Sequence, residues 1–230
     1  GVLIDSQLIN PNDCQNIKNL ISDNSQIIRK AAADFIAKRE FFDNENSDNL
    51  DHFLTFIRNF HVKKDIHFIV LSLYPYLKCL KKWDEMCNRL ISEENDDRSK
   101  IISAILLHSA KIAINQAENY SQNNATKAKN SQDNQNIEKV IKKARKLTFV
   151  LIQNLPQLLK AYQSSKNKEI IQNLVETSSF LDLNAISENS FEKQYEKLLN
   201  QLHEIFIKFN QGNDENIKLF KAAFNSIYIL

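Results

Sequence analysis

An alanine-rich stretch from Asp23 to Ile36, DNSQIIRKAAADFI, constrains the fold more than any other feature of the sequence. A polar turn that can cap a helix leads into apolar residues that share one helical face. Ala32 and Ala33 would allow a neighbouring helix to approach closely. Larger side chains would fill the space on either side: Ile28, Phe35 and Ile36. A similar pattern recurs from Asp214 to Leu230, which favours a chain built from repeated helices.

Apolar residues recur at helical spacing through most of the chain, most regularly between Phe191 and Phe209. Asn10 and Pro11 are expected at the cap and first position of the first helix. We predict that Pro75 bends its helix and that Pro156 bends or restarts its helix. The expected helices cover residues 10–22, 26–36, 50–60, 66–80, 83–92, 96–119, 137–159, 168–177, 191–209 and 214–230. This order predicts an all-α fold, an α-solenoid of HEAT-like antiparallel helix pairs.

One polar stretch breaks this order. Residues 119–136, NYSQNNATKAKNSQDNQN, have almost no apolar side chains that could offset the entropy of ordering them. We predict a mobile surface insert that interrupts a repeat rather than a linker between two domains. The chain lacks an initiator Met and ends inside an apolar helical run, so residues 1–230 are expected to be a single HEAT-repeat segment of a longer chain.

Residue usage excludes several classes of function. With glycine only at positions 1 and 212, the chain cannot contain a phosphate-binding P-loop or a dinucleotide-binding G-x-G-x-x-G turn. The five histidines lack metal-ligand spacing, and the three cysteines are expected to be reduced and buried. We therefore predict no catalytic residue, no metal, no cofactor and no small-molecule substrate. The absence of a long apolar run or a leader sequence predicts a soluble intracellular protein without membrane contact.

The sequence has one marked surface feature, a local excess of basic residues. Residues 127–168 contain ten lysines and arginines and two acidic residues, a local excess of eight positive charges. Four of these lysines fall within an arc of about 100° on a helix. The candidate site for DNA or a partner protein is Lys139, Lys142, Lys143, Arg145 and Lys146. Phosphates or an acidic protein segment would relieve the repulsion among them, although an ordinary solvated lysine face is an alternative. No aromatic residue interleaves the lysines, which disfavours readout of single strands.

Four stretches, in order, resemble the central part of the stromal antigen (stromalin) subunit of cohesin. Leu80–Met86, LKKWDEM, is similar to the Asp-Trp-Glu-Cys-Met run of that family. Residues 147–162, LTFVLIQNLPQLLKAY, resemble its LTEHFI-x-x-LP-x-LL-x-x-Y pattern, and residues 173–183, NLVETSSFLDL, resemble NLL-x-x-P-x-x-FDL. The fourth stretch is residues 192–202, EKQYEKLLNQL.

The resemblance implies a non-catalytic HEAT-repeat, armadillo-like helical scaffold. Such a scaffold would bind the kleisin subunit of cohesin, and through it the coiled-coil ATPase subunits. Together with the kleisin it would bind double-stranded DNA in chromatin. It would support sister-chromatid cohesion and chromosome segregation during the cell cycle, in the nucleus and on chromosomes.

The chain also departs from the family. Ser178 stands where the family motif has Pro, and residues 119–136 match no family motif. The family's pocket for aromatic-containing peptides lies upstream of this segment. Trp83, although it matches, is expected to wedge into the core. Two alternatives stay open at this point: a HEAT-repeat scaffold of a nuclear transport or other chromatin complex, and a regulatory helical domain of a multidomain enzyme.

Overall fold

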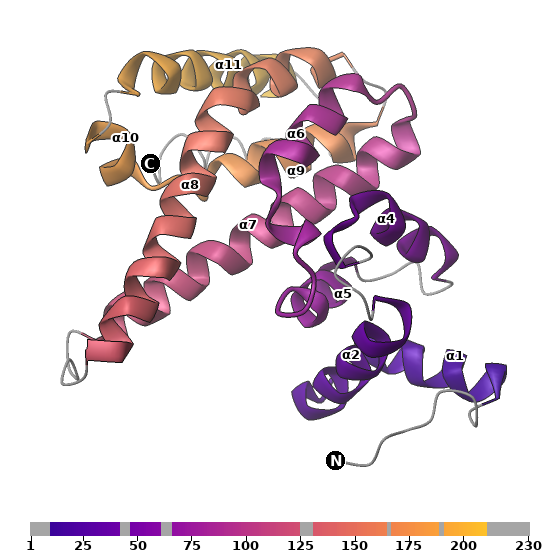
Figure 1. Ribbon diagram of the computed structural model, residues 1–230. Helices are drawn as coiled ribbons and strands as arrows, with labels where there is room; N and C mark the ends of the chain where they lie inside the picture. Colours follow the sequence, from indigo (N-terminus) through magenta and orange to yellow (C-terminus); the bar gives the residue numbers. More distant parts are fainter. Residues whose placement is uncertain are drawn as a thin grey trace. The chain divides into compact units, whose positions relative to one another are not determined.

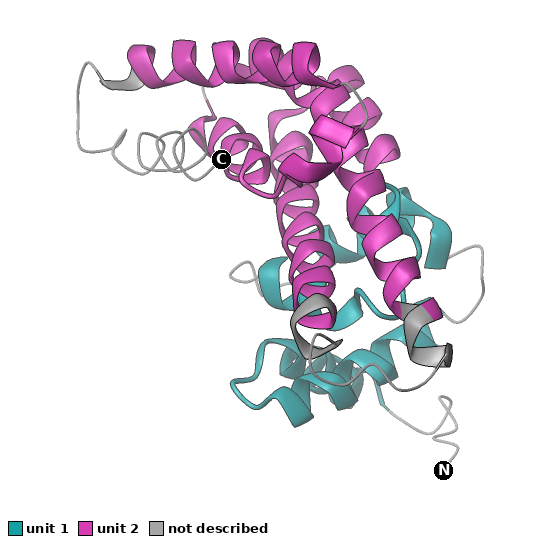
Figure 2. Ribbon diagram, turned by 90° about the vertical axis from the view of Figure 1, so that its left-hand side faces the viewer, with its two compact units in different colours: residues 1–82 teal, residues 83–230 magenta. Residues whose placement is uncertain are grey.

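The computed structural model describes residues 10–41, 47–60, 66–124, 131–164, 167–188 and 191–210. Within them every regular element is a helix, which confirms the all-α class with HEAT-like helix packing. The chain divides into two compact units, unit 1 (residues 1–82) and unit 2 (residues 83–230) (Figures 1 and 2). That they form a single HEAT-repeat segment stays a prediction. The helix predicted over 214–230 lies outside the described residues.

Unit 1 is a cluster of short helices in which α2 packs against α1, η1 and α5. Asn10 caps α1 as predicted, because its Oδ1 accepts a hydrogen bond of 2.9 Å from the backbone N–H of Asp13. Asn49 caps α4 in the same way, accepting from the N–H of His52 at 3.1 Å. The helices are α1 (Pro11–Asn19), η1 (Leu20–Ser22), α2 (Gln26–Glu40), α4 (Leu50–Asn59), α5 (Ile66–Leu73) and η2 (Cys79–Lys81).

The alanine-rich helix α2 packs as predicted through its small residues. Ala32 and Ala33 are buried, as is Ile36. Ile28 departs from the prediction, since 40% of its surface is exposed. The physical reason is angular: at 100° per residue Ile28 lies about 140° from Ala33, at the edge of the buried stripe. Phe35 lies near the same edge and is half-buried.

The helix predicted over residues 66–80 is shorter than expected. α5 ends at Leu73, and the chain continues through a turn into η2. Pro75 has no N–H to donate, and its ring disfavours helical backbone at the residue before it, so it ends the helix in place of the predicted bend. The stretch stays apolar inside, because Leu77 and Leu80 are fully buried.

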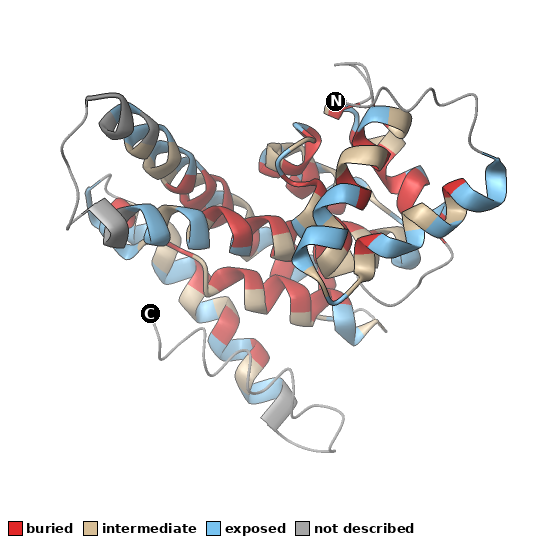
Figure 3. Cartoon of the chain, turned by 90° about the horizontal axis from the view of Figure 1, so that it is seen from below, coloured by how far each residue is buried: buried red, intermediate tan, exposed pale blue. Residues whose placement is uncertain are grey.

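Helix α8 organises unit 2, because it packs against each of the other described helices of this unit. Its inner side carries Leu147, Leu151 and Leu155, all fully buried. Figure 3 shows buried positions concentrated where helices face one another. The helices are α6 (Trp83–Ser92), α7 (Asp96–Asn124), α8 (Ser131–Tyr162), α9 (Lys168–Ser178), α10 (Leu183–Glu188) and α11 (Glu192–Asn210).

Three features of unit 2 differ from the sequence-based expectation. Both α7 and α8 extend into the polar stretch at 119–136, reaching Asn124 and beginning at Ser131, so helix covers more of it than predicted. Mobility of this stretch stays a prediction. α8 continues as a helix through Pro156 without restarting. The short helix α10, which was not predicted, begins at Leu183 and is capped by Asp182, whose Oδ1 accepts from the N–H groups of Asn184 and Ala185.

Buried polar links fix how these helices sit on one another. The hydroxyl of Tyr162, at the end of α8, donates to the Leu90 carbonyl of α6 at 2.8 Å and lies 2.9 Å from Ser99 Oγ of α7. Asn173 of α9 donates through its side chain to Ser103 Oγ of α7 at 3.1 Å. Because buried polar groups are costly without partners, these bonds favour one register of the helices over others.

Removing the Tyr162 hydroxyl is expected to loosen the junction of α6, α7 and α8. Tyr162→Phe should lower the free energy of unfolding by about 1–2 kcal/mol, because the buried Leu90 carbonyl and Ser99 hydroxyl lose a partner. Urea denaturation measures the change. The matched control is Tyr195→Phe on α11, where no hydroxyl contact is found among the described residues. Equal losses in both variants would contradict a specific role of the Tyr162 bonds.

Candidate functional site

Four of the five predicted site residues form one exposed surface on α8. Lys139, Lys142, Lys143 and Lys146 are all solvent-exposed. Among the described residues, none of these ammonium groups has a carboxylate within ion-pair distance. We call these four residues the lysine face. Like charges at neighbouring helical positions repel one another, and anionic groups beside these lysines would relieve that repulsion.

Arg145 is set apart from the lysine face. It is half-buried, and its Nη2 lies 3.2 Å from Glu188 Oε2 at the end of α10. The position follows from helical geometry, because Arg145 lies about 60° beyond the edge of the lysine arc at 100° per residue. The structure thus places four of the predicted residues together and gives the fifth a partner on another helix. Binding by the five stays a prediction.

One aromatic residue, missed in the sequence analysis, adjoins the basic side chains. A hollow of about 640 Å³ is lined, within the described residues, by the five basic residues and Phe149. The signal was present, since Phe149 follows Lys142 by seven residues, or two helical turns. Its ring packs on Phe191 with centroids 5.2 Å apart, and it is half-buried. Packing of this kind leaves little of the ring free to stack on a base.

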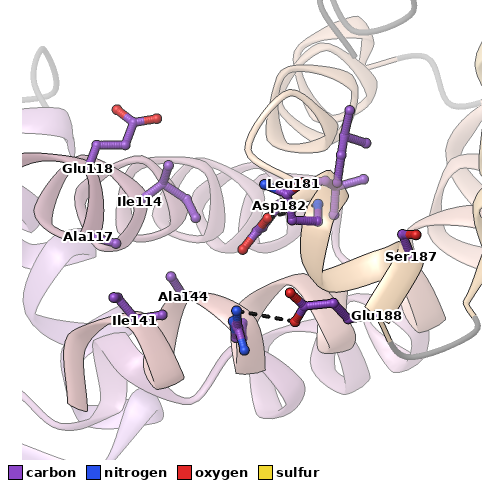
Figure 4. Close-up of a pocket in the computed structure, with 12 residues that line it drawn as sticks. Ile114, Ala117, Glu118, Ile141, Ala144, Leu181, Asp182, Ser187 and Glu188 are labelled. Atoms are coloured by element: carbon purple, nitrogen blue, oxygen red, sulfur yellow. Dashed lines mark hydrogen bonds and ion pairs between the residues drawn. The ribbon is translucent and has the colours of Figure 1, made fainter. Parts of the chain in front are cut away.

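A second hollow lies among α7, α8 and α10, and we call it the α10 pocket (Figure 4). Its volume is about 680 Å³. Side chains from three separate segments line it, among them Ile114 of α7, Ile141 of α8 and Leu181 just before α10. Sequence reasoning missed this pocket because it predicted no helix between residues 177 and 191. Asp182, a common type of helix cap, was the local signal that a further helix begins there.

The described residues contain no group of three or more histidine, cysteine or acidic side chains that could hold a metal ion. His61 lies outside them. The three cysteines are free and buried, as predicted. Burial raises the pKa of the Cys87 thiol from its ordinary value of 9.0 to about 12, with a further contribution from the nearby Asp84 carboxylate. Among the described helices, none combines the length and apolar character needed to cross a bilayer.

The family comparison matches residues 68–224 to the family described as cohesin subunit SCC3/SA, HEAT-repeats domain. The chain belongs to the SCC3/SA family. The match includes the four stretches that resemble stromalin, and the family prediction is therefore confirmed. No curated protein is similar enough to match the chain. The family assignment favours cohesin over the transport and enzyme-regulatory alternatives.

Membership in the SCC3/SA family gives the chain a scaffold role in the cohesin complex. The family is a structural scaffold and is not known as an enzyme. It points to the nucleus or the chromosome as the location. The α8 lysine face and the α10 pocket both lie inside the matched range. The alanine-rich stretch of α2, which suggested helical repeats, lies outside it.

Two family motif positions have clear structural roles. Trp83 begins α6 and is almost fully buried, which confirms its expected place in the core. Ser178, which replaces the family proline, is the last residue of α9, and its buried hydroxyl donates to the Val175 carbonyl at 2.6 Å. A serine here donates a hydrogen bond to a carbonyl in the last turn of the helix, which a proline could not do.

The buried thiols give a testable pH dependence. Because the pKa of Cys87 is higher in the folded protein than in the unfolded chain, its contribution to stability is present below about pH 9 and is lost as the pH rises toward about 12. A variant that keeps only Cys87 (Cys14→Ser, Cys79→Ala) should lose about 1–2 kcal/mol of unfolding free energy between pH 8 and 10.5 beyond the loss in a variant without any thiol, which also carries Cys87→Ala. Urea denaturation at each pH measures this difference. Parallel pH profiles would contradict the assignment.

Proposed function

We propose that this segment of a cohesin scaffold binds the kleisin subunit and, together with it, double-stranded DNA. In this role it supports sister-chromatid cohesion and chromosome segregation and reaches the coiled-coil ATPase subunits through the kleisin. The observation that carries the DNA-binding part is the lysine face of α8, whose four ammonium groups are exposed and lack carboxylate partners among the described residues.

DNA is favoured over an ordinary solvated face by the spacing and the absence of neutralising partners among the described residues. From Lys139 to Lys146 the helix advances by about 10 Å, and duplex DNA carries one negative charge per about 1.7 Å of its axis. Several phosphates therefore lie within reach of the lysine face. Placing lysines against phosphates releases condensed counterions, which favours binding at low salt.

The chemistry supports duplex binding without sequence readout. Lysines contact phosphates, which position a protein on DNA but carry no sequence information. Stacking on single-stranded bases requires exposed aromatic faces, whereas Phe149 is half-buried against Phe191. The proposed contact is accordingly electrostatic and sensitive to salt.

Reversing the charge of the lysine face tests the DNA contact. Lys142→Glu, Lys143→Glu and Lys146→Glu together should weaken binding to duplex DNA and reduce the slope of log K against log salt by about three. Fluorescence anisotropy with a labelled duplex at several salt concentrations measures both. The control is Lys111→Glu, Lys193→Glu and Lys197→Glu, which changes the net charge equally at three exposed lysines elsewhere in unit 2. Unchanged binding by the first variant at low salt, or equal loss in both, would remove this face from the function.

Kleisin binding is tested by co-purification. The full-length subunit, co-expressed with the kleisin of its own organism, should co-elute with it from gel filtration as one complex. A kleisin segment of scrambled sequence and identical composition is the control, because it keeps the charge and loses the order of its apolar anchors. Separate elution of the native kleisin, or recovery of transport cargo in its place, would contradict the proposal.

A further inference from the structure

The α10 pocket lies on the side of α8 opposite the lysine face. At 100° per residue, the pocket-lining positions Ile141 and Ala144 are centred roughly 180° from the centre of the lysine arc. Beside its polar groups, the pocket lining includes apolar side chains from three different segments, Ile114, Ile141 and Leu181 (Figure 4). Its volume of about 680 Å³ is within the range of pockets that hold a ligand side chain or a small molecule.

The charges around this pocket are the reverse of those on the lysine face. Within the part of the chain that the structure describes, three carboxylates line it, Glu118 of α7, Asp182 before α10 and Glu188 at the end of α10, against one guanidinium, Arg145. The excess is two negative charges. Figure 4 shows the Asp182 carboxylate between the side chains of α7 and α8 and the ion pair of Glu188 at one side. Such a surface repels phosphate and attracts a cation.

We propose that the α10 pocket binds a short peptide segment of a partner protein in which an apolar side chain is adjacent to Arg or Lys. The apolar side chain packs against Ile114, Ile141 and Leu181. The basic side chain lies against the carboxylates of Glu118 and Asp182.

Several residues that line the pocket are exposed to solvent, which favours a protein segment as the ligand over an enclosed small molecule. Glu118 and Glu188 are solvent-exposed, and Leu183, also part of the lining, exposes 37% of its surface. An open rim of this kind allows a chain to enter and leave on either side, with one side chain as the anchor. The excess of negative charge selects basic over acidic segments.

Selection from random peptides identifies the sequence that the pocket prefers. Random dodecapeptides displayed on phage are selected on the full chain, after depletion on the Ala117→Phe variant, in which the new ring fills the pocket. Depletion removes peptides that bind elsewhere, including acidic ones on the lysine face. We expect enriched sequences with Leu, Ile or Val within two positions of Arg or Lys. Sequences without this pairing, or no enrichment after depletion, would overturn the proposal.

The enriched peptide is then synthesised with a fluorophore and measured by anisotropy. Glu118→Lys and Leu183→Ala should each weaken its binding by about five- to tenfold. The matched controls are Glu196→Lys and Ile207→Ala, both exposed positions on α11 outside the pocket, and they should change binding by less than about twofold. Equal effects in test and control variants would show that the peptide binds elsewhere.

These variants leave the lysine face intact, so the pocket and the proposed DNA contact are tested separately. Circular dichroism and thermal melts show whether each variant is folded. If Ala117→Phe does not fold, Glu118→Lys, an exposed substitution, replaces it in the depletion step. Peptide binding that survives Lys142→Glu, Lys143→Glu and Lys146→Glu is the expected result, and loss of peptide binding in that variant would contradict a site on the opposite side of α8.

Discussion

The arrangement of unit 2 depends on the burial of one side of α8 against every other described helix of that unit. Leu147, Leu151 and Leu155 supply the apolar contact, and the Tyr162 hydroxyl fixes the end of α8 against α6 and α7. Because that side of α8 is buried, the side chains on the opposite side of the helix remain exposed to solvent. Since rotation of α8 about its axis would bring lysines into the core, the lysine face is held in water by the cost of desolvating its charges.

Sequence periodicity predicted the helices well where one apolar side is buried and short polar links separate the elements. α6 begins at Trp83 and ends at Ser92 as expected, and the cap of α1 at Asn10 was readable from its neighbour Pro11. The predictions of helix ends were less accurate at proline, because a proline in a helical pattern can either end the helix or be accommodated within it. Pro75 ends a helix, whereas Pro156 is accommodated inside one, and the difference depends on packing that no local pattern encodes.

In the candidate site, too, some features could be predicted from the sequence and others depend on tertiary structure. Exposure of the four lysines was predictable because they share one helical arc, and the position of Phe149 was readable two turns after Lys142. The pairing of Arg145 with Glu188 was not predictable, because it joins residues 43 positions apart through the fold of α8 and α10. The α10 pocket was equally hidden, since its walls come from three segments that only tertiary structure brings together.

Arg145 belongs to both surfaces of α8, lining the basic hollow as well as the acidic pocket. The four lysines line only the basic hollow, so substituting one of them changes the charge of that surface and leaves the lining of the pocket unchanged. Substitution at Arg145 is pleiotropic, because it alters both surfaces at once and frees Glu188.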